Sequence, residues 1–234
     1  MQLIDSSPQR IRANQQNIAI VVVALFALST TASALPVTNV ALNKQVTLEG
    51  TFFNNAGSWG GTYPTQPAIS SAQQALADTV TDGIFKPDEW QWNNGTTWWD
   101  THNRPAAYVN IDLAGTFYLE SFVVQADDND AYLLEYWNLT SFSWATAWNV
   151  PNFGNHGWGL QTRPNDTNNS ERYMLGTPIT TTKLRLSGVG GDQYYSTSEI
   201  QAFGYKTQDV PEPATLLLLG AGLMAGGLVR RKRV

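Results

Sequence analysis

The feature that most constrains this chain is an apolar run near its C-terminal end, residues 214–229, followed at once by a basic cluster. The run has no charged residue and is 16 residues long, just under the roughly 17 to 25 that cross a bilayer as a helix. Basic residues beyond an apolar run hold that end of a helix in the cytoplasm. The pattern therefore predicts a transmembrane helix with a basic cytoplasmic tail, residues 230–234. Its length alone also allows a buried core helix.

The residues before this run form a short stiff element, because each proline restricts its own backbone and that of the residue before it. Residues 206–213 are thus expected to be a linker that ends in Pro211, Glu212 and Pro213. The order Pro-Glu-Pro, apolar helix and basic tail resembles the PEP-CTERM sorting signal of Gram-negative bacteria. The residues that carry this resemblance are Pro211, Glu212, Pro213, Arg230, Arg231, Lys232 and Arg233.

The resemblance implies recognition of the Pro-Glu-Pro motif by an exosortase-like membrane protease, and cleavage near it. It further implies that the protein is anchored in the inner membrane during sorting and then delivered to the cell surface or the extracellular matrix. Proteins with this signal tend to come from bacteria that secrete exopolysaccharide. The signal thus indicates where the protein goes, and only by association what it contacts.

The N-terminal segment, residues 1–34, has the pattern of a secretory signal peptide. Arg10 and Arg12 precede an apolar stretch, residues 18–28, and Ala32-Ser33-Ala34 fits the A-x-A cleavage pattern. Cleavage between Ala34 and Leu35 is the prediction. An uncleaved anchor is the alternative, since the segment before the apolar stretch is long.

Between these ends, residues 35–209 form an acidic stretch of a size that suits one domain. It contains 8 Lys and Arg against 17 Asp and Glu, a net charge of −9 that the whole-chain value of −5 conceals. Such a charge disfavours nucleic acid and anionic polysaccharide as partners. The chain has no cysteine, so an exported domain must be stabilised by core packing or bound ions.

The composition of this domain predicts β-structure. The domain contains nine Trp, nine Tyr and eight Phe, and short alternating runs are separated by turn residues, a pattern typical of sandwiches and barrels. Residues 71–77 are the only stretch that suggests a helix. The expected strands are residues 45–48, 108–113, 119–125, 132–137, 146–150, 183–187 and 199–205.

Several short motifs come in the order expected of a discoidin-like domain, the coagulation factor 5/8 C-terminal type. They are Asn-Val-Ala-Leu-Asn-Lys at 39–44, Val-Thr-Asp-Gly at 80–83, Trp-Trp at 98–99, Tyr-Val-Asn-Ile-Asp-Leu at 108–113, Lys-Leu-Arg-Leu at 183–186 and Ser-Glu-Ile-Gln-Ala-Phe-Gly at 198–204. The resemblance covers about residues 40–204 and implies an all-β, galactose-binding-like jelly-roll β-sandwich, whose domain we place at residues 35–205. Two departures stand out: no disulfide can join the ends, and Ala114 precedes the expected glycine, Gly115.

This resemblance also implies a structural calcium ion between the Asp-Gly turn and the last strand. Hard cations bind six to eight oxygens from carboxylates and carbonyls. The matching positions are Thr79, Asp82, Ile84, Ser198 and Glu199. Ile84 supplies only a carbonyl, which weakens the match. The alternative is that Asp82 caps a turn and Glu199 forms an ordinary surface pair.

Tryptophans in three expected loops are candidates for stacking on sugar rings: Trp59, Trp92 and Trp158. Some sugar-binding members of the family use His and Arg from loops at one end, so His102 and Arg104 are candidate ligand-binding residues. The alternative for each Trp is core packing, since sandwiches bury large aromatic side chains. Trp98 or Trp99, Trp137 and Trp148 are expected in the core.

The acidic sequence Asp127-Asp128-Asn129-Asp130 lies between two expected strands. Its spacing resembles part of a calcium loop, but it lacks the glycine and later glutamate of an EF-hand. We therefore expect a solvated hairpin turn.

Catalytic motifs are absent from the sequence, which has no H-E-x-x-H, G-x-S-x-G or phosphate-binding loop and no cysteine nucleophile. The sequence therefore predicts an exported, non-enzymatic protein that binds neutral carbohydrate or exopolysaccharide. Two alternatives remain open. One is a structural or adhesion protein of the matrix that contacts protein, and the other is a glycoside hydrolase with a carboxylate pair.

Overall fold

The computed structural model describes residues 35–53, 71–154, 159–165 and 167–207, and within them the chain is almost entirely β-structure. One α-helix, α1 (Ser71–Asp78), runs into a short 3-10 turn, Thr79–Thr81. The strands are β1 (Thr38–Asn39), β2 (Gln45–Glu49), β3 (Phe52–Phe53), β4 (Thr97–Asp100), β5 (Tyr108–Asp127), β6 (Ala131–Asn138), β7 (Ser143–Val150), β8 (Leu160–Arg163), β9 (Tyr173–Gly190) and β10 (Tyr194–Lys206).

Two long strands, β5 and β9, belong to both layers of a sandwich. The first half of β5 pairs with β2 and with the second half of β9, which in turn pairs with β6, and β6 pairs with β7. The second half of β5 pairs with β10, β8 and the first half of β9, and β10 pairs with β4 and β1. All of these pairings are antiparallel. We call the layer β2–β5–β9–β6–β7 the front sheet and the other the back sheet.

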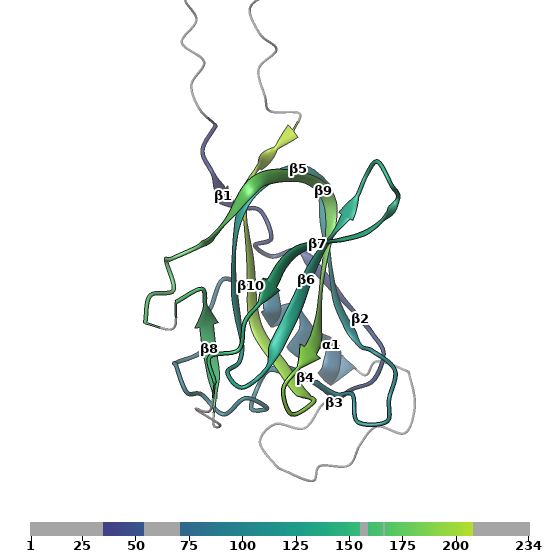
Figure 1. The fold of residues 1–234 in the computed structure, drawn as a ribbon, viewed down its shortest axis with the longest axis vertical. Coiled ribbons are helices and arrows are strands. Elements are labelled where there is room, and N and C mark those ends of the chain that lie inside the picture. Colours follow the sequence, from purple (N-terminus) through teal and green to yellow (C-terminus); the bar gives the residue numbers. More distant parts are fainter. Residues whose placement is uncertain (1–34, 54–70, 155–158, 166, 208–234) are drawn as a thin grey trace, which may run out of the picture. The chain divides into compact units, whose positions relative to one another are not determined.

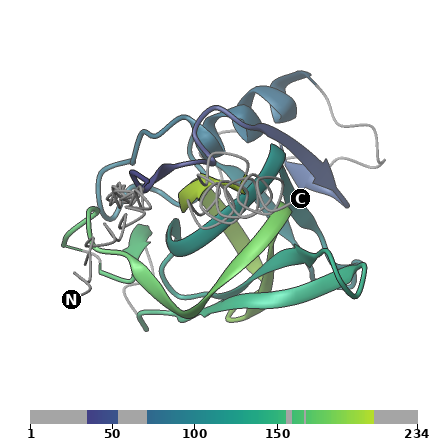
Figure 2. The same ribbon diagram turned by 90° about the horizontal axis from the view of Figure 1, so that it is seen from above.

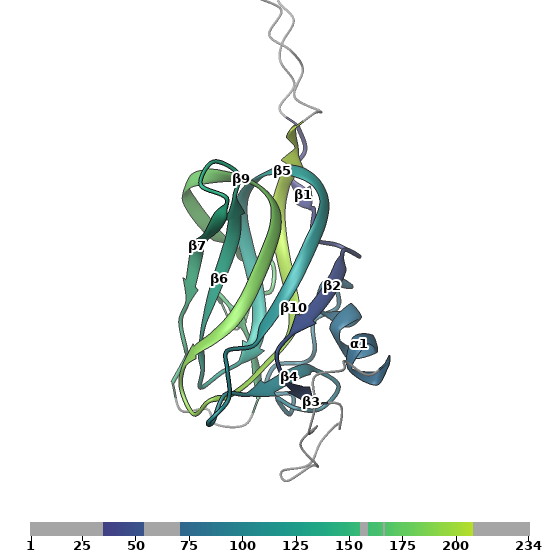
Figure 3. The same cartoon turned by 90° about the vertical axis from the view of Figure 1, so that its right-hand side faces the viewer.

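The bend between the layers is visible in Figure 1, where β5 and β9 arch over one end of the domain. Figure 3 shows the five strands of the front sheet side by side, in the order β7, β6, β9, β5 and β2. Ala114 lies at the bend of β5 with a φ of 56°, and the Asp112 carboxylate accepts a hydrogen bond from its N–H at 2.9 Å. The displaced glycine of the sequence motif thus leaves an alanine in the left-handed region, which L-residues seldom adopt.

The core lies between the two sheets. Alternate residues of the front sheet, such as Val109, Ile111 and Leu113, are fully buried, while Asn110 and Asp112 face outward. Tyr132 of β6 reaches across the core, where its hydroxyl donates to the carbonyl of Ser196 on β10 at 3.0 Å. Its ring meets Trp99 and Tyr195. Aromatic side chains thus join the layers in place of a disulfide.

Helix α1 covers the free edge of β2, since Gln74 donates to the carbonyl of Val46 at 2.9 Å; the view from above in Figure 2 shows the helix beside this strand. An α1 side chain, Gln73, also donates to the carbonyl of Phe52 in β3. The helix thereby occupies hydrogen-bonding groups of the strand edges that would otherwise need another partner.

The prediction of an all-β sandwich is confirmed, and each predicted strand overlaps an observed one. The ranges 108–113 and 119–125 form one long strand, β5, while β3, β4, β8 and the first half of β9 were not predicted. Trp98, Trp99 and Trp148 are buried as expected, but Trp137 is not a core residue: it packs against Trp144 on the outer face of the front sheet.

Both predicted targeting segments, residues 1–34 and 214–229, lie outside the described residues, as does the tail 230–234. Within the described part of the chain, no helix is both long enough and apolar enough to cross a membrane.

Candidate functional site

Asp100, the last residue of β4, organises a cluster of polar side chains. Its buried carboxylate accepts hydrogen bonds from the backbone N–H and the Nδ1 of His102, at 2.6 and 2.8 Å. Its second oxygen accepts one from Arg104 Nη1 at 3.2 Å. The structure thus brings the two predicted ligand residues, His102 and Arg104, onto one carboxylate. We call these three residues the end site.

A tight turn places the two side chains on the same carboxylate. Arg104 N–H donates to the carbonyl of Thr101 at 3.2 Å, and Asn103 has a φ of 54°, a conformation that asparagine tolerates better than most residues. Thr101 N–H donates to Gln193 in the β9–β10 turn at 3.1 Å. The end site therefore lies where β4 and the β9–β10 turn meet, at the bottom of Figure 1.

Two aromatic rings support the polar groups. The His102 ring packs on Tyr194 with centroids 4.7 Å apart, and the Arg104 guanidinium lies 5.5 Å from the centre of the Phe53 ring. Because Asp100 can only accept, Nδ1 of His102 donates, and in the neutral ring Nε2 is the atom left for a ligand. His102 and Arg104 remain partly exposed, at 39% and 27% of their side-chain surface.

The predicted role of Trp92 as an exposed stacking residue is wrong. Only 5% of Trp92 is exposed, and it belongs to a small aromatic core with Phe53, Trp98 and Leu160. Its ring meets Trp98 edge-on at 5.2 Å. The side chain was assigned to a loop, yet this loop folds back onto β3 and β4 and buries it. The other two candidates, Trp59 and Trp158, lie outside the described residues.

The structure brings two of the five predicted calcium ligands together. Glu199 is fully buried, and its carboxylate accepts hydrogen bonds from Gly83 N–H at 3.2 Å and from Gln201 Nε2 at 3.1 Å. Asp82, next to Gly83, is close enough to raise the pKa of Glu199. Its own carboxylate accepts the N–H of Ile84 at 2.8 Å. The reading of Glu199 as a surface residue is therefore excluded.

At the other three predicted positions the expected ligand atoms are backbone carbonyls, and one of them, that of Thr79, already accepts a hydrogen bond. The carbonyl of Thr79 accepts the N–H of Asp82 at 3.3 Å, and the Ser198 hydroxyl donates to Gln125 at 2.7 Å. Ile84 exposes 65% of its surface. Across the described residues, no group of three or more His, Cys, Asp or Glu side chains is placed to hold a metal ion. Any cation here must rely on two carboxylates and on backbone oxygens.

Burial is the main reason that the pKa of Glu199 is raised. The pKa of this carboxyl is raised to about 8, against an ordinary value of 4.5: burial raises it most, the bonds from Gln201 and Gly83 oppose the shift, and the neighbouring Asp82 adds to it. A buried carboxylate with only neutral donors is costly to ionise. A cation beside it would offset that cost, so the residue types and their burial fit a hard cation such as calcium.

The prediction of a solvated turn at Asp127–Asp130 is wrong. The side chains of Asp127, Asp128 and Asp130 are buried, because the guanidinium of Arg163 is enclosed beneath the turn. Arg163 donates to the carbonyls of Ala126, Asp127, Asp128, Asp130, Pro151 and Gln161. The turn is thus ordered around one buried cation.

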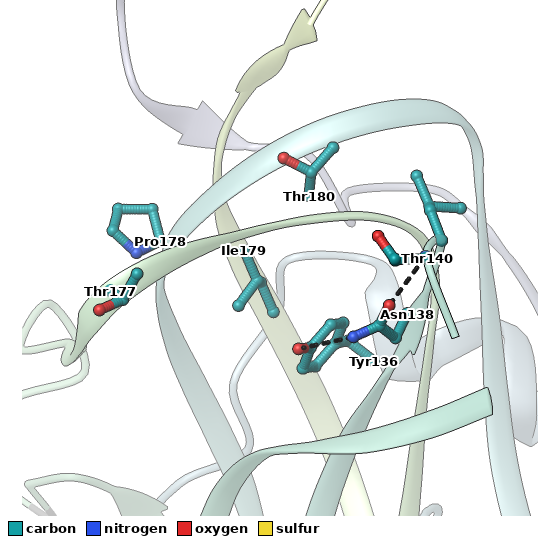
Figure 4. A pocket seen from close by; sticks show the side chains of 8 residues that line it. Tyr136, Asn138, Thr140, Thr177, Pro178, Ile179 and Thr180 are labelled. Atoms are coloured by element: carbon teal, nitrogen blue, oxygen red, sulfur yellow. Dashed lines mark hydrogen bonds between the residues drawn. The ribbon is translucent and has the colours of Figure 1, made fainter. Parts of the chain in front are cut away.

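A separate groove of about 520 Å³ opens at the other end of the sandwich, between the β6–β7 connection and the arch of β9. Figure 4 shows Tyr136, Asn138 and Ile179 lining it, with Asn138 Nδ2 donating to the Tyr136 hydroxyl at 3.5 Å. Threonines 140, 177 and 180 add hydroxyl groups at its rim. Of the predicted ligand contacts that the structure describes, Trp92, His102 and Arg104, none lines this groove.

Sequence reasoning missed four residues that shape these sites: Asp100, Tyr194, Phe53 and Arg163. A signal existed for Asp100, which stands two residues before His102 and four before Arg104, the spacing of a turn closed by a carboxylate. No local signal marks Tyr194 or Phe53, since strand pairing over long sequence separations brings them to the site. Arg163 lies in a short strand that the sequence pattern did not reveal.

Comparison with known protein families places one match at the end of the chain, where residues 209–233 match the PEP-CTERM protein-sorting motif. The chain carries a PEP-CTERM sorting motif. This confirms the prediction made from its Pro-Glu-Pro sequence, apolar run and basic tail. Comparison with curated protein sequences gives no match.

Solved structures similar to this chain include carbohydrate-binding modules and lectins. A chitosan-binding module of a chitosanase/glucanase from Paenibacillus sp. IK-5 is 18% identical, with a TM-score of 0.43, over 71% of this chain and 99% of the module. A fucose-binding module of Streptococcus pneumoniae is 14% identical, with a TM-score of 0.44, over 72% of this chain and 99% of the module. A fucolectin from the serum of striped bass, Morone saxatilis, is 12% identical, with a TM-score of 0.46, over 74% and 50% of the two chains.

Proposed function

We propose that this PEP-CTERM protein is a non-enzymatic carbohydrate-binding protein of the cell surface or exopolysaccharide matrix, and that the end site contacts the sugar. The observation that carries the proposal is the convergence of His102 and Arg104 on the buried carboxylate of Asp100. Both side chains are held in place and still partly exposed, as a preorganised contact requires.

The chemistry of the end site suits sugar hydroxyls. The Arg104 guanidinium carries N–H donors, and Nε2 of the His102 ring accepts a hydrogen bond when the ring is neutral, so the pair offers both kinds of group to a sugar hydroxyl. Tyr194 and Phe53 provide an apolar floor beneath them. A few placed polar groups over aromatic walls are the usual make-up of a ligand site.

A neutral glycan is the expected ligand. Residues 35–209 carry a net charge of −9, so a polyanionic chain would be repelled on approach. The binding should therefore depend only weakly on salt, in contrast to the steep dependence of polyanion binding.

The placement of the end site fits a surface protein. The sorting motif follows β10, whose last residues lie at the top of Figure 1, while the end site lies at the bottom. A domain attached through its C-terminal end would thus present the end site away from its attachment. Processing by an exosortase-like protease, after anchoring in the inner membrane, is part of this proposal.

A structural calcium ion at Asp82 and Glu199 completes the proposal. These carboxylates would hold the ion together with backbone oxygens of the turn near Thr79 and Ile84. Bound calcium would fix the Asp-Gly turn to β10 and so stabilise the fold. It would take no part in contacting the sugar.

The test is a glycan array with the full-length protein in detergent, followed by calorimetric titration of the neutral glycans that bind. His102→Ala and Arg104→Ala should each weaken binding by about tenfold or more, because each removes a positioned hydrogen-bonding group. Arg172→Ala, which removes a cation remote in sequence from the end site, is the matched control and should leave the affinity unchanged.

Trp92→Ala should lower the melting temperature, because its ring is part of the aromatic core. If the folded wild type binds no neutral glycan but captures a matrix protein, the proposal of carbohydrate binding is rejected. The protein is then better explained as a structural or adhesion protein. Release of reducing sugar from a bound glycan would overturn the assignment as a non-enzyme.

A further inference from the structure

The outer face of the front sheet carries polar and aromatic side chains in register across five strands. One row crosses the sheet through Thr47, Asn110, Arg185, Glu135 and Thr146. The next row brings Asp112 opposite Lys183, and Trp137 opposite Trp144. Figure 3 shows the five strands that present this face. Neighbouring strands lie about 4.8 Å apart, so each row is a ladder of regularly spaced side chains.

Arg185 fixes the centre of this face. Its Nε donates to the Glu135 carboxylate at 2.6 Å, and both side chains are mostly covered, with 17% and 12% exposed. The same guanidinium lies 4.3 Å from the centre of the Tyr108 ring and 4.4 Å from that of Trp144. Trp144 also meets Trp137 edge-on at 5.4 Å. Each of these side chains therefore has a defined orientation before any ligand arrives.

A groove of about 250 Å³ runs beside this stack over β2, β5 and β9. Its lining residues include Gln45, Thr47, Asn110, Asp112, Lys183 and Trp144. They supply amide, hydroxyl, carboxylate and ammonium groups beside one indole. A hydroxyl-rich ligand needs such a mixture, because each sugar hydroxyl can both donate and accept.

The charges on the face indicate an uncharged ligand. Arg185 is paired with Glu135, and Lys183 lies opposite Asp112 in the β5–β9 register. Glu49, which also lines the groove, leaves the face with a negative excess of one charge. The face therefore does not attract a polyanion, and one extra carboxylate attracts a polycation only weakly. The side chains of one row recur at regular spacing across the sheet. Successive units of an extended polymer can contact them all, whereas a single compact molecule would contact only part of the row.

We propose that the outer face of the front sheet is a second glycan-binding surface, which takes an extended segment of a neutral polysaccharide in the groove beside Trp144. This surface is separate from the end site, since no residue is shared between them. One domain with two sites can hold two chains, or two parts of one chain, and so gains avidity on a polymer that it lacks on a short sugar.

The experiment removes the end site first. The full-length protein carrying His102→Ala and Arg104→Ala is titrated by calorimetry with linear neutral hexasaccharides of glucose, xylose and mannose. At least one of them should still bind, with one site per chain. Adding Asp112→Ala, or separately Trp144→Ala, should weaken that binding by about tenfold or more. Adding Asn149→Ala, an exposed residue of β7 outside the groove, is the matched control and should change nothing.

Two separate variants protect the test against misfolding, because neither side chain is part of the buried core. Asp112 also accepts the N–H of Ala114 at the bend of β5, so the melting temperature of each variant is measured alongside the titration. The proposal is overturned if none of the hexasaccharides binds, or if binding survives both substitutions. It is also overturned if sedimentation shows a dimer of the wild type that Trp144→Ala dissociates, since the occupant would then be a second copy of the chain. Loss of the end site alone leaves these results unchanged, so the two proposals fail separately.

Discussion

Arg163 binds Asp130 through the backbone: its Nη2 donates to the Asp130 carbonyl oxygen at 3.2 Å, while the side chains of both residues are buried. The same guanidinium holds the carbonyls on either side of the turn and also that of Pro151. The β5–β6 turn, the start of β6 and β8 are thereby tied to a single side chain.

Replacing this side chain should be severely destabilising. Arg163→Met leaves several buried carbonyls without a donor, and we expect a loss of about 3 to 5 kcal/mol in the free energy of unfolding. Urea denaturation of both proteins measures it. Arg172→Met is the matched control: that guanidinium stacks on Phe203 at 3.5 Å, a contact that contributes about 0.5 to 1 kcal/mol. Equal stability of Arg163→Met and wild type would contradict the structural role of the cluster.

Stability should fall as the pH rises from about 4 to 9. Burial, with the neighbouring acidic residues, raises the pKa of Asp127 to about 9 and that of Asp130 to about 8, against an ordinary 3.8. The folded protein then binds more protons than the unfolded chain throughout this window, so the stabilisation is complete below about 4 and is lost as the pH passes the folded pKa values.

Urea denaturation at pH 5, 7 and 9, with chelator present, measures this fall. Asp127→Asn removes one of the titrating groups and should flatten the dependence. Asp78→Asn, at an exposed position of α1, is the control and should keep the wild-type dependence of stability on pH. A stability that rises between pH 5 and 9 would show that these carboxyls are ionised in the folded protein.

Calcium should raise the melting temperature. A ligand that binds only the folded state stabilises it by RT ln(1 + [L]/Kd), about 2.7 kcal/mol at a hundredfold excess over Kd. A bound ion would also keep Glu199 ionised, which would oppose the shift of its pKa caused by burial. Thermal melts with calcium and with chelator test this. Asp82→Ala should abolish the response, and Asp112→Ala, an exposed aspartate on another strand, should not. Identical melts of metal-free protein with and without calcium would exclude the site.

The β-sandwich fold could be predicted from the sequence, because the alternation of buried and exposed residues in strands such as residues 108–113 is a local pattern. Short motifs in the sequence also suggested that Asp82 lies near Glu199, and His102 and Arg104 were grouped because they flank Asn103. Sequence reasoning failed where burial depends on contacts distant in sequence. Trp92 looks like a loop residue until β3 and β4 close over it, and Asp127–Asp130 looks solvated until Arg163 is placed beneath the turn.

Processing is the prediction on which the location of the protein depends. The A-x-A pattern at Ala32 and Ala34 predicts a mature chain that begins near Leu35, and the sorting motif at residues 209–233 predicts an end near Pro211, Glu212 and Pro213. The described fold extends from residue 35 to residue 207, so both cuts would spare it. Intact mass measurement of the protein recovered from the cell surface tests both ends at once.

Substitutions in the basic tail test the C-terminal signal. Replacing Arg230, Arg231, Lys232 and Arg233 with neutral residues should weaken retention in the inner membrane, since the charges that hold the tail in the cytoplasm are lost. The mature mass should then become rare in surface material. Replacing Lys44 and Lys86, basic residues of the domain outside both proposed sugar sites, is the control for overall charge and should leave processing intact. Surface protein that still ends at Val234 would show that the C-terminal motif is not cleaved, and the chain would then remain a membrane-anchored protein.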